Sequence, residues 1–207
     1  MEIAVMTQST LLVAASLLLS SGTTYGQALS GEALIRALQH GGHVIVMRHA
    51  SSPREAPSPQ NADADNVNHD RQLDQAGRAS AIAMGKALRK LRIRIGEVYT
   101  SPTYRARETA QLAQLPNPRT IIELGDGGRS MQNITENQAE WLRNRAAQLP
   151  SGVNTVIVTQ FPNISGAFPQ WASGLADGEA LVLGSDGKGG VALIGRITIQ
   201  EWPQFRP

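Results

Sequence analysis

The stretch "HVIVMRHASS" (residues 43–52) decides how the fold and the function of this chain are interpreted. Its apolar run, Val44 to Met47, is typical of a strand buried on both faces of a sheet. The chain then changes at once to a cation and an imidazole, Arg48 and His49. Two interpretations fit these ten residues: the strand surfaces into solvent at Arg48, or its end carries a binding site.

The rest of the chain alternates strand-like and helix-like segments. Further strands are predicted at residues 97–101, 119–124 and 155–160, and a final hairpin of two strands over residues 179–199. Helices are predicted from Asp74 onward and over residues 103–115, 134–149 and 162–173. This alternation predicts an α/β domain, a three-layer sandwich with a largely parallel central sheet and an antiparallel edge.

The helix that follows Asp74 has the clearest local signals. Asp74 is a good N-cap, and Ala81, Met84, Leu88 and Leu91 recur at spacings of three and four residues. Such spacing places the apolar side chains on one face, which we expect to pack on the sheet.

Composition excludes several classes of function. The chain has 207 residues, of which 41% are hydrophobic and 17% charged, as in an ordinary globular protein of one domain. A net charge of +2 and an aromatic content of 4% disfavour nucleic acid as a partner. The absence of cysteine excludes disulfides, thiolate nucleophiles and Cys-ligated metals.

The N-terminus is typical of an export signal. The apolar stretch "LLVAASLLLSS" (residues 11–21) is short for a membrane span, and small residues follow it. We therefore expect a signal peptide over residues 1–28, a domain over residues 29–207, and a periplasmic or secreted protein with no stable membrane span after cleavage. No basic residue precedes the stretch, and Glu2 has the wrong sign, so an uncleaved anchor and a wrongly assigned start codon remain alternatives.

Cationic side chains follow the predicted strands at their carboxyl ends, where sheets of this class bind ligands. Arg48 and His49 follow the first strand, Arg105 and Arg107 lie in "TSPTYRARETA" (residues 100–110), and Gln160 ends the strand at 155–160. Guanidinium groups bind a phosphate dianion bidentately, and a neutral imidazole can attack phosphorus. This set of residues predicts a phosphate site that requires no metal and no cofactor.

Several motifs together resemble the histidine phosphatase superfamily, in the branch that includes phosphoglycerate mutases and small bacterial phosphatases. They are "VMRHA" (46–50), "RQLDQAGR" (71–78), "YTSPTYRARETA" (99–110), "VIVTQFPNI" (156–164) and "GEALVL…GRITIQEW" (178–202). They occur in order over nearly the whole predicted domain. The resemblance implies a phosphoglycerate mutase-like fold and metal-independent hydrolysis of a phosphomonoester.

Within that resemblance, His49 would be the nucleophile that forms a phosphohistidine intermediate. Arg48 and Arg105 would bind the phosphoryl oxygens, whereas Arg107 would lie on another face of its helix. Gln160 stands where the family places a second histidine. A glutamine amide can donate a hydrogen bond but stays neutral at every pH, and the loss of one charged donor costs on the order of 10²–10³ in rate. Two hypotheses therefore stand: a slowed phosphatase, and an inactive phospho-ligand-binding pseudophosphatase.

The general acid and the substrate are less specified by the sequence. The family supplies the proton from a carboxylate near the site, and Glu123 is the preferred candidate, with Asp126 and Glu179 as alternatives. The expected partner is a small-molecule phosphate ester, with an envelope phosphosugar as the first class to screen. Substrate choice is expected to depend on the polar segment from Pro53 to Asp70, in which His69 could touch the substrate.

Overall fold

The computed structural model describes residues 28–126 and 134–207. Within these residues the sheet has six strands in the order β3-β2-β4-β1-β5-β6. The strands are β1 Val44–Arg48, β2 Ile95–Thr100, β3 Arg119–Thr120, β4 Asn154–Thr159, β5 Ala180–Ser185 and β6 Val191–Ile197. The pairs β1/β4, β2/β4 and β2/β3 are parallel, and β1/β5 and β5/β6 are antiparallel. The predicted fold class, with its antiparallel edge, is confirmed.

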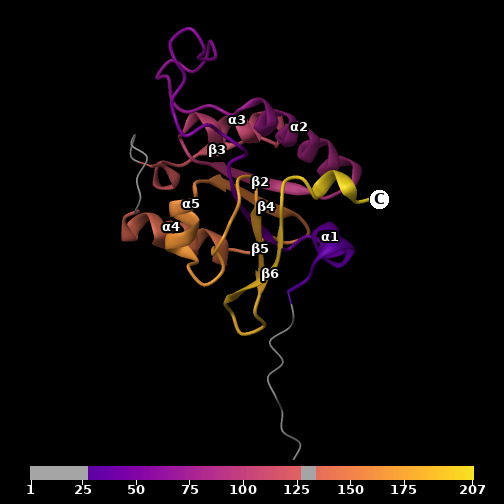
Figure 1. The fold of residues 1–207 in the computed structure, drawn as a ribbon. Helices are drawn as coiled ribbons and strands as arrows, with labels where there is room; N and C mark the ends of the chain where they lie inside the picture. The colour runs from indigo at the N-terminus through magenta and orange to yellow at the C-terminus, as the bar shows by residue number, and fades with distance from the viewer. Residues whose placement is uncertain (1–27, 127–133) are drawn as a thin grey trace, which may run out of the picture.

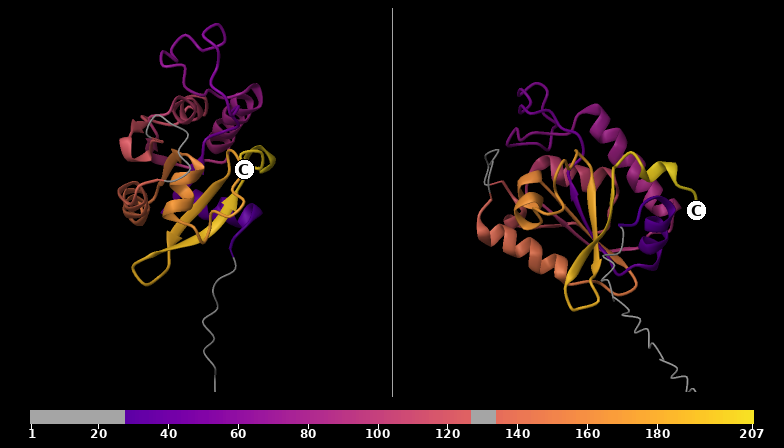
Figure 2. Two further views of the ribbon diagram at one scale, coloured as in Figure 1. Left: turned by 60° about the vertical axis from the view of Figure 1, so that its left-hand side comes forward. Right: turned by 60° about the horizontal axis from the view of Figure 1, so that its bottom comes forward.

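Helices cover both faces of this sheet (Figures 1 and 2). They are α1 Gly31–His40, α2 Gln75–Lys90, α3 Tyr104–Leu112, α4 Glu136–Ala147 and α5 Phe161–Ala167, with the 3₁₀ helices η1 Ile122–Leu124 and η2 Trp202–Gln204. One buried cluster joins the sheet to α1, α2, α3 and η2, and a second joins it to α4 and α5. The molecule is therefore a three-layer sandwich.

The local signals of the sequence act as expected in α2 and α4. Asp74 caps α2 by accepting a hydrogen bond from the backbone N–H of Gly77, and Ala81, Met84, Leu88 and Leu91 are all buried. In α4 the Thr135 side chain and Gln138 form a reciprocal capping box. These caps satisfy backbone groups that the first turn of a helix leaves unpaired.

Other segments differ from the prediction. The strand expected over residues 119–124 is reduced to Arg119–Thr120, because the chain turns at Ile121 into η1. Residues 162–173 were expected to be helical, but α5 ends at Ala167. Residues 31–40, for which no element was predicted, form α1 and bury Leu34, Ile35 and Leu38 against the sheet.

The register of β1 against β4 positions the polar residues that follow these strands. Arg48 pairs with Thr159, and the backbone N–H of His49 donates to the carbonyl of Thr159 at 2.9 Å. Because β1, β2 and β4 run parallel, their carboxyl ends meet at one edge of the sheet. Residues far apart in the sequence are thereby brought together at this edge.

Candidate active site

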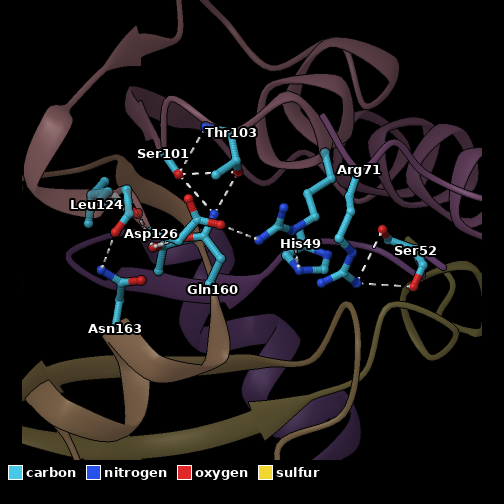
Figure 3. A network of polar contacts seen from close by, with 12 residues as sticks. His49, Ser52, Arg71, Ser101, Thr103, Leu124, Asp126, Gln160 and Asn163 are labelled. Carbon is cyan, nitrogen blue, oxygen red and sulfur yellow. Dashed lines mark hydrogen bonds and ion pairs between the residues drawn. The ribbon is translucent and has the colours of Figure 1, made fainter. Parts of the chain in front are cut away.

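A pocket of about 90 Å³ lies at the carboxyl ends of β1 and β4. The described residues that line it are Arg48, His49, Arg71, Arg105, Asp126, Gln160, Phe161 and Pro162. Figure 3 shows part of its polar network. The structure thus places His49, Arg48, Arg105 and Gln160, which the sequence singled out, in a single pocket.

The imidazole of His49 is buried, with 3% of its surface exposed. Its Nδ1 lies 2.8 Å from the carbonyl oxygen of Ala50, and its Nε2 lies 3.0 Å from the Nε of Arg105. A carbonyl oxygen only accepts and a guanidinium only donates, so Nδ1 carries the proton and Nε2 presents its lone pair. This is the tautomer that an attack from Nε2 requires.

The pKa of His49 is lowered to about 3, chiefly by burial and further by the neighbouring cations Arg105, Arg48 and Arg71, while the hydrogen bond to Ala50 acts in the opposite direction. An imidazole with a pKa this far below its usual value is uncharged at neutral and mildly acidic pH. The resting form of His49 is therefore the uncharged form that the predicted nucleophilic role requires.

Arg105 and Arg48 each contact a carboxylate as well as the pocket. Arg105 is buried and donates to Asp126 at 3.0 Å through Nη2. Arg48 contacts Asp177 at 2.6 Å through Nη2 and the carbonyl of Leu175 at 3.1 Å through Nη1. The Nε of Arg48 is buried without a hydrogen-bond partner in the part of the chain that the structure describes. A buried N–H without a partner is costly.

Arg71 is a pocket residue to which the sequence analysis gave no role. Its Nε donates to the carbonyl of Pro53 at 2.6 Å, and its Nη2 contacts the carbonyl of Ser52 at 3.4 Å. Burial and the nearby cations lower its pKa from the usual value of a guanidinium, which nonetheless stays charged. The motif "RQLDQAGR" contained the signal, but no residue of it was assigned to the site.

Gln160 is oriented away from the donor role expected of it. It is 3% exposed, and its Nε2 donates to the Ser101 hydroxyl at 2.8 Å and to the Thr103 hydroxyl at 2.6 Å (Figure 3). An amide nitrogen carries two N–H groups, so this arrangement uses both. Gln160 therefore lines the pocket without offering it an N–H.

The candidate carboxylates occupy different environments. Asp126 lines the pocket beside Arg105. Glu123, the preferred candidate from the sequence, is exposed and is not among the described lining residues. Glu179 accepts hydrogen bonds from Arg196 at 2.7 Å and from the N–H of Ala176 at 2.9 Å, and it is not among the described lining residues. The geometry favours Asp126 over Glu123 and Glu179.

Two further residues from the sequence analysis lie outside the pocket lining. Arg107 is exposed, with its guanidinium 5.7 Å from the ring centre of Tyr104. His69 is exposed in the segment from Pro53 to Asp70. Among residues 28–126 and 134–207, no cluster of His, Asp or Glu side chains is arranged to hold a metal ion, and no helix is long and apolar enough to cross a membrane.

Comparison with known proteins identifies the family. The sequence profile of the histidine phosphatase superfamily (branch 1) matches residues 44–150. The chain belongs to this superfamily. Residues 44–150 include His49, Arg48, Arg71, Arg105 and Asp126, so these pocket residues lie inside the matched region. Among curated protein sequences, none matches this chain at a significant level.

Solved structures of phosphatases share its fold. The protein histidine phosphatase SixA, in a complex with tungstate, has 16% sequence identity and a TM-score of 0.56, with coverage of 77% of this chain and 98% of SixA. A phosphoserine phosphatase mutant from Entamoeba histolytica, in a complex with phosphoserine, has 14% identity and a TM-score of 0.54, with coverage of 76% and 98%. At these identities, the comparison establishes the fold.

The depressed pKa of His49 predicts a pH dependence of stability. In the unfolded chain the imidazole takes up a proton near pH 6.5, whereas folded His49 stays neutral down to a pKa of about 3. The unfolded state therefore binds more protons between these values, and the free energy of unfolding falls as the pH drops. At pH 5 this loss is about 2 kcal/mol. The variant His49→Asn lacks this titrating imidazole. Urea unfolding in phosphate-free buffer should therefore show the free energy of unfolding of wild type falling by about 2 kcal/mol more than that of the variant between pH 7 and 5. Parallel pH curves for the two proteins would contradict the prediction.

The ion pair between Arg48 and Asp177 predicts stronger anion binding in Asp177→Asn. The substitution removes a negative charge that repels a bound dianion, while the Leu175 carbonyl still holds the guanidinium. Tungstate should bind about tenfold more tightly, as measured by calorimetry at constant ionic strength. Glu140→Gln, which makes the same charge change on the exposed side of α4, should leave the affinity unchanged. Weaker binding by Asp177→Asn would mean that Asp177 serves chiefly to orient Arg48.

Proposed function

We propose that this histidine phosphatase hydrolyses a small phosphate monoester through a phosphohistidine intermediate on His49. The observation that carries the proposal is the neutral Nε2 of His49, which faces Arg105 inside a pocket also lined by Arg48 and Arg71. In this structure the lone pair accepts the Nε–H of Arg105, so attack on phosphorus requires Arg105 to release it and to turn its N–H groups to the phosphoryl oxygens.

The proposed reaction has two steps, transfer of the phosphoryl group to His49 and hydrolysis of the phosphohistidine. The Nε2 lone pair of His49 forms a bond to phosphorus while the ester P–O bond breaks, and Asp126, which enters this step as the carboxylic acid, gives its proton to the leaving oxygen. Water then attacks phosphorus, the N–P bond breaks, and Asp126 takes up a proton from that water. Neutral His49 and inorganic phosphate result, and no metal takes part in either step.

Gln160 supports the proposal that the enzyme is slow. We place it at the position of the family's second histidine, where a charged donor would help to hold the phosphoryl group. Its amide N–H groups are instead donated to Ser101 and Thr103. The same observation favours the second candidate function, a pseudophosphatase that binds a phospho-ligand without turnover.

Location and substrate class complete the proposal. The apolar stretch at residues 11–21 supports export by a signal peptide over residues 1–28 and a periplasmic or secreted domain over residues 29–207. An envelope phosphosugar is then a first class of ester to test.

Hydrolysis of p-nitrophenyl phosphate distinguishes the enzyme from the binder. His49→Ala should abolish the activity because the nucleophile is lost. Gln160→His should raise the rate, by up to the factor of 10²–10³ that one preorganised charged donor provides. Arg107→Ala, on the exposed side of α3, is the control and should behave as wild type. If wild type is as inactive as His49→Ala, the pseudophosphatase hypothesis is correct.

The role of Asp126 predicts a dependence on the leaving group. An alkoxide needs the proton far more than p-nitrophenolate does, so Asp126→Asn should lower kcat for an alkyl phosphate by about 100-fold and for the aryl ester much less. Glu123→Gln, three residues earlier and exposed, should leave both rates unchanged. The opposite result for the two variants would restore Glu123 as the general acid.

A further inference from the structure

Phe161 is an exposed aromatic residue at the edge of the phosphate pocket. It follows Gln160 directly as the first residue of α5, lines the pocket together with Pro162, and is 37% exposed. Other large apolar side chains are exposed among the described residues, but Phe161 is the one of them that lines this pocket. An apolar group at the opening of a ligand site is a natural contact for an apolar part of the ligand.

The Phe161 ring lies beside Arg48, an expected phosphate ligand. The guanidinium of Arg48 lies 5.8 Å from the ring centre. Pro162, in the first turn of α5, restricts the backbone next to it. An ester whose phosphoryl oxygens are bound by Arg48 therefore has its organic group within reach of this ring.

The polar lining residues offer little to the hydroxyl groups of an ester. Gln160 has donated both amide N–H groups, and Arg71 donates to the loop at Ser52 and Pro53. Arg105 is engaged by His49 and Asp126. The other N–H groups of Arg71 and Arg105 serve the phosphoryl oxygens in the proposed function, so the organic group is left mainly with apolar contact to Phe161.

We propose that Phe161 selects esters whose leaving group is apolar. The best such leaving group would carry an aromatic ring that stacks on the ring of Phe161. The hydrolysis of such esters rests on the proposed function, whereas their selective binding does not. Among candidate substrates, esters with a ring next to the phosphate then rank ahead of small hydrophilic phosphates and of envelope phosphosugars.

The test compares benzylphosphonate with methylphosphonate, two ligands with the same anionic group that no phosphatase can hydrolyse at the P–C bond. Calorimetry on wild type should show benzylphosphonate binding about tenfold more tightly, the factor expected for one aromatic contact. Phe161→Ala should lose this preference and leave the affinity for methylphosphonate unchanged. The control Ile122→Ala removes a side chain that is 82% exposed and not among the described lining residues, and it should keep the preference.

Three results would overturn the proposal. They are equal affinities of wild type for the two ligands, no binding of either, and an equal loss for both in Phe161→Ala, which would show that Phe161 acts only by supporting Arg48. Hydrolysis is measured separately, with benzyl phosphate against ethyl phosphate. A preference for benzylphosphonate without hydrolysis of either ester would refute the proposed phosphatase and support Phe161 as the selective contact.

Discussion

The contact between Nε2 of His49 and the Nε–H of Arg105 organises the whole site, because it can exist only while the imidazole is uncharged. The fold enforces that state in two ways. It buries the ring at the end of β1, and it surrounds the ring with the guanidinium groups of Arg105, Arg48 and Arg71. The carbonyl of Ala50 then fixes the tautomer. The uncharged imidazole is thus held among three cations with its lone pair on Nε2.

Much of this fold could be predicted from local sequence signals. The run Val44 to Met47 is buried on both faces of the sheet, so its continuous apolar residues clearly indicated a strand. Asp74 caps α2 because its carboxylate accepts a hydrogen bond from a backbone N–H of the first turn. The strand expected over residues 119–124 was too long, because β3 lies at the edge of the sheet and pairs only with β2. Without a second neighbour, apolar residues after Thr120 gain little from remaining extended, and the chain turns into η1.

The site was foreseeable only where motifs lie directly at strand ends. Arg48 ends β1, and His49 and Gln160 directly follow β1 and β4, so parallel pairing alone predicts that they meet. The partners of these residues come from loops that no periodicity describes: Arg48 meets Asp177 from a distant turn, and Gln160 meets the hydroxyls of Ser101 and Thr103. Asp126 was an alternative rather than the first choice, since a sequence does not show which of two neighbouring carboxylates faces inward.

The carboxylate beside Arg48 has a consequence for the release of product in the proposed reaction. The guanidinium of Arg48 already has an anionic partner within the protein, Asp177, so its charge is partly compensated before any ligand enters. Inorganic phosphate, the common product of every monoester, therefore experiences a weaker attraction than a pocket of bare arginines would exert. Such a site would bind its substrate less tightly and release inorganic phosphate more readily before the next turnover.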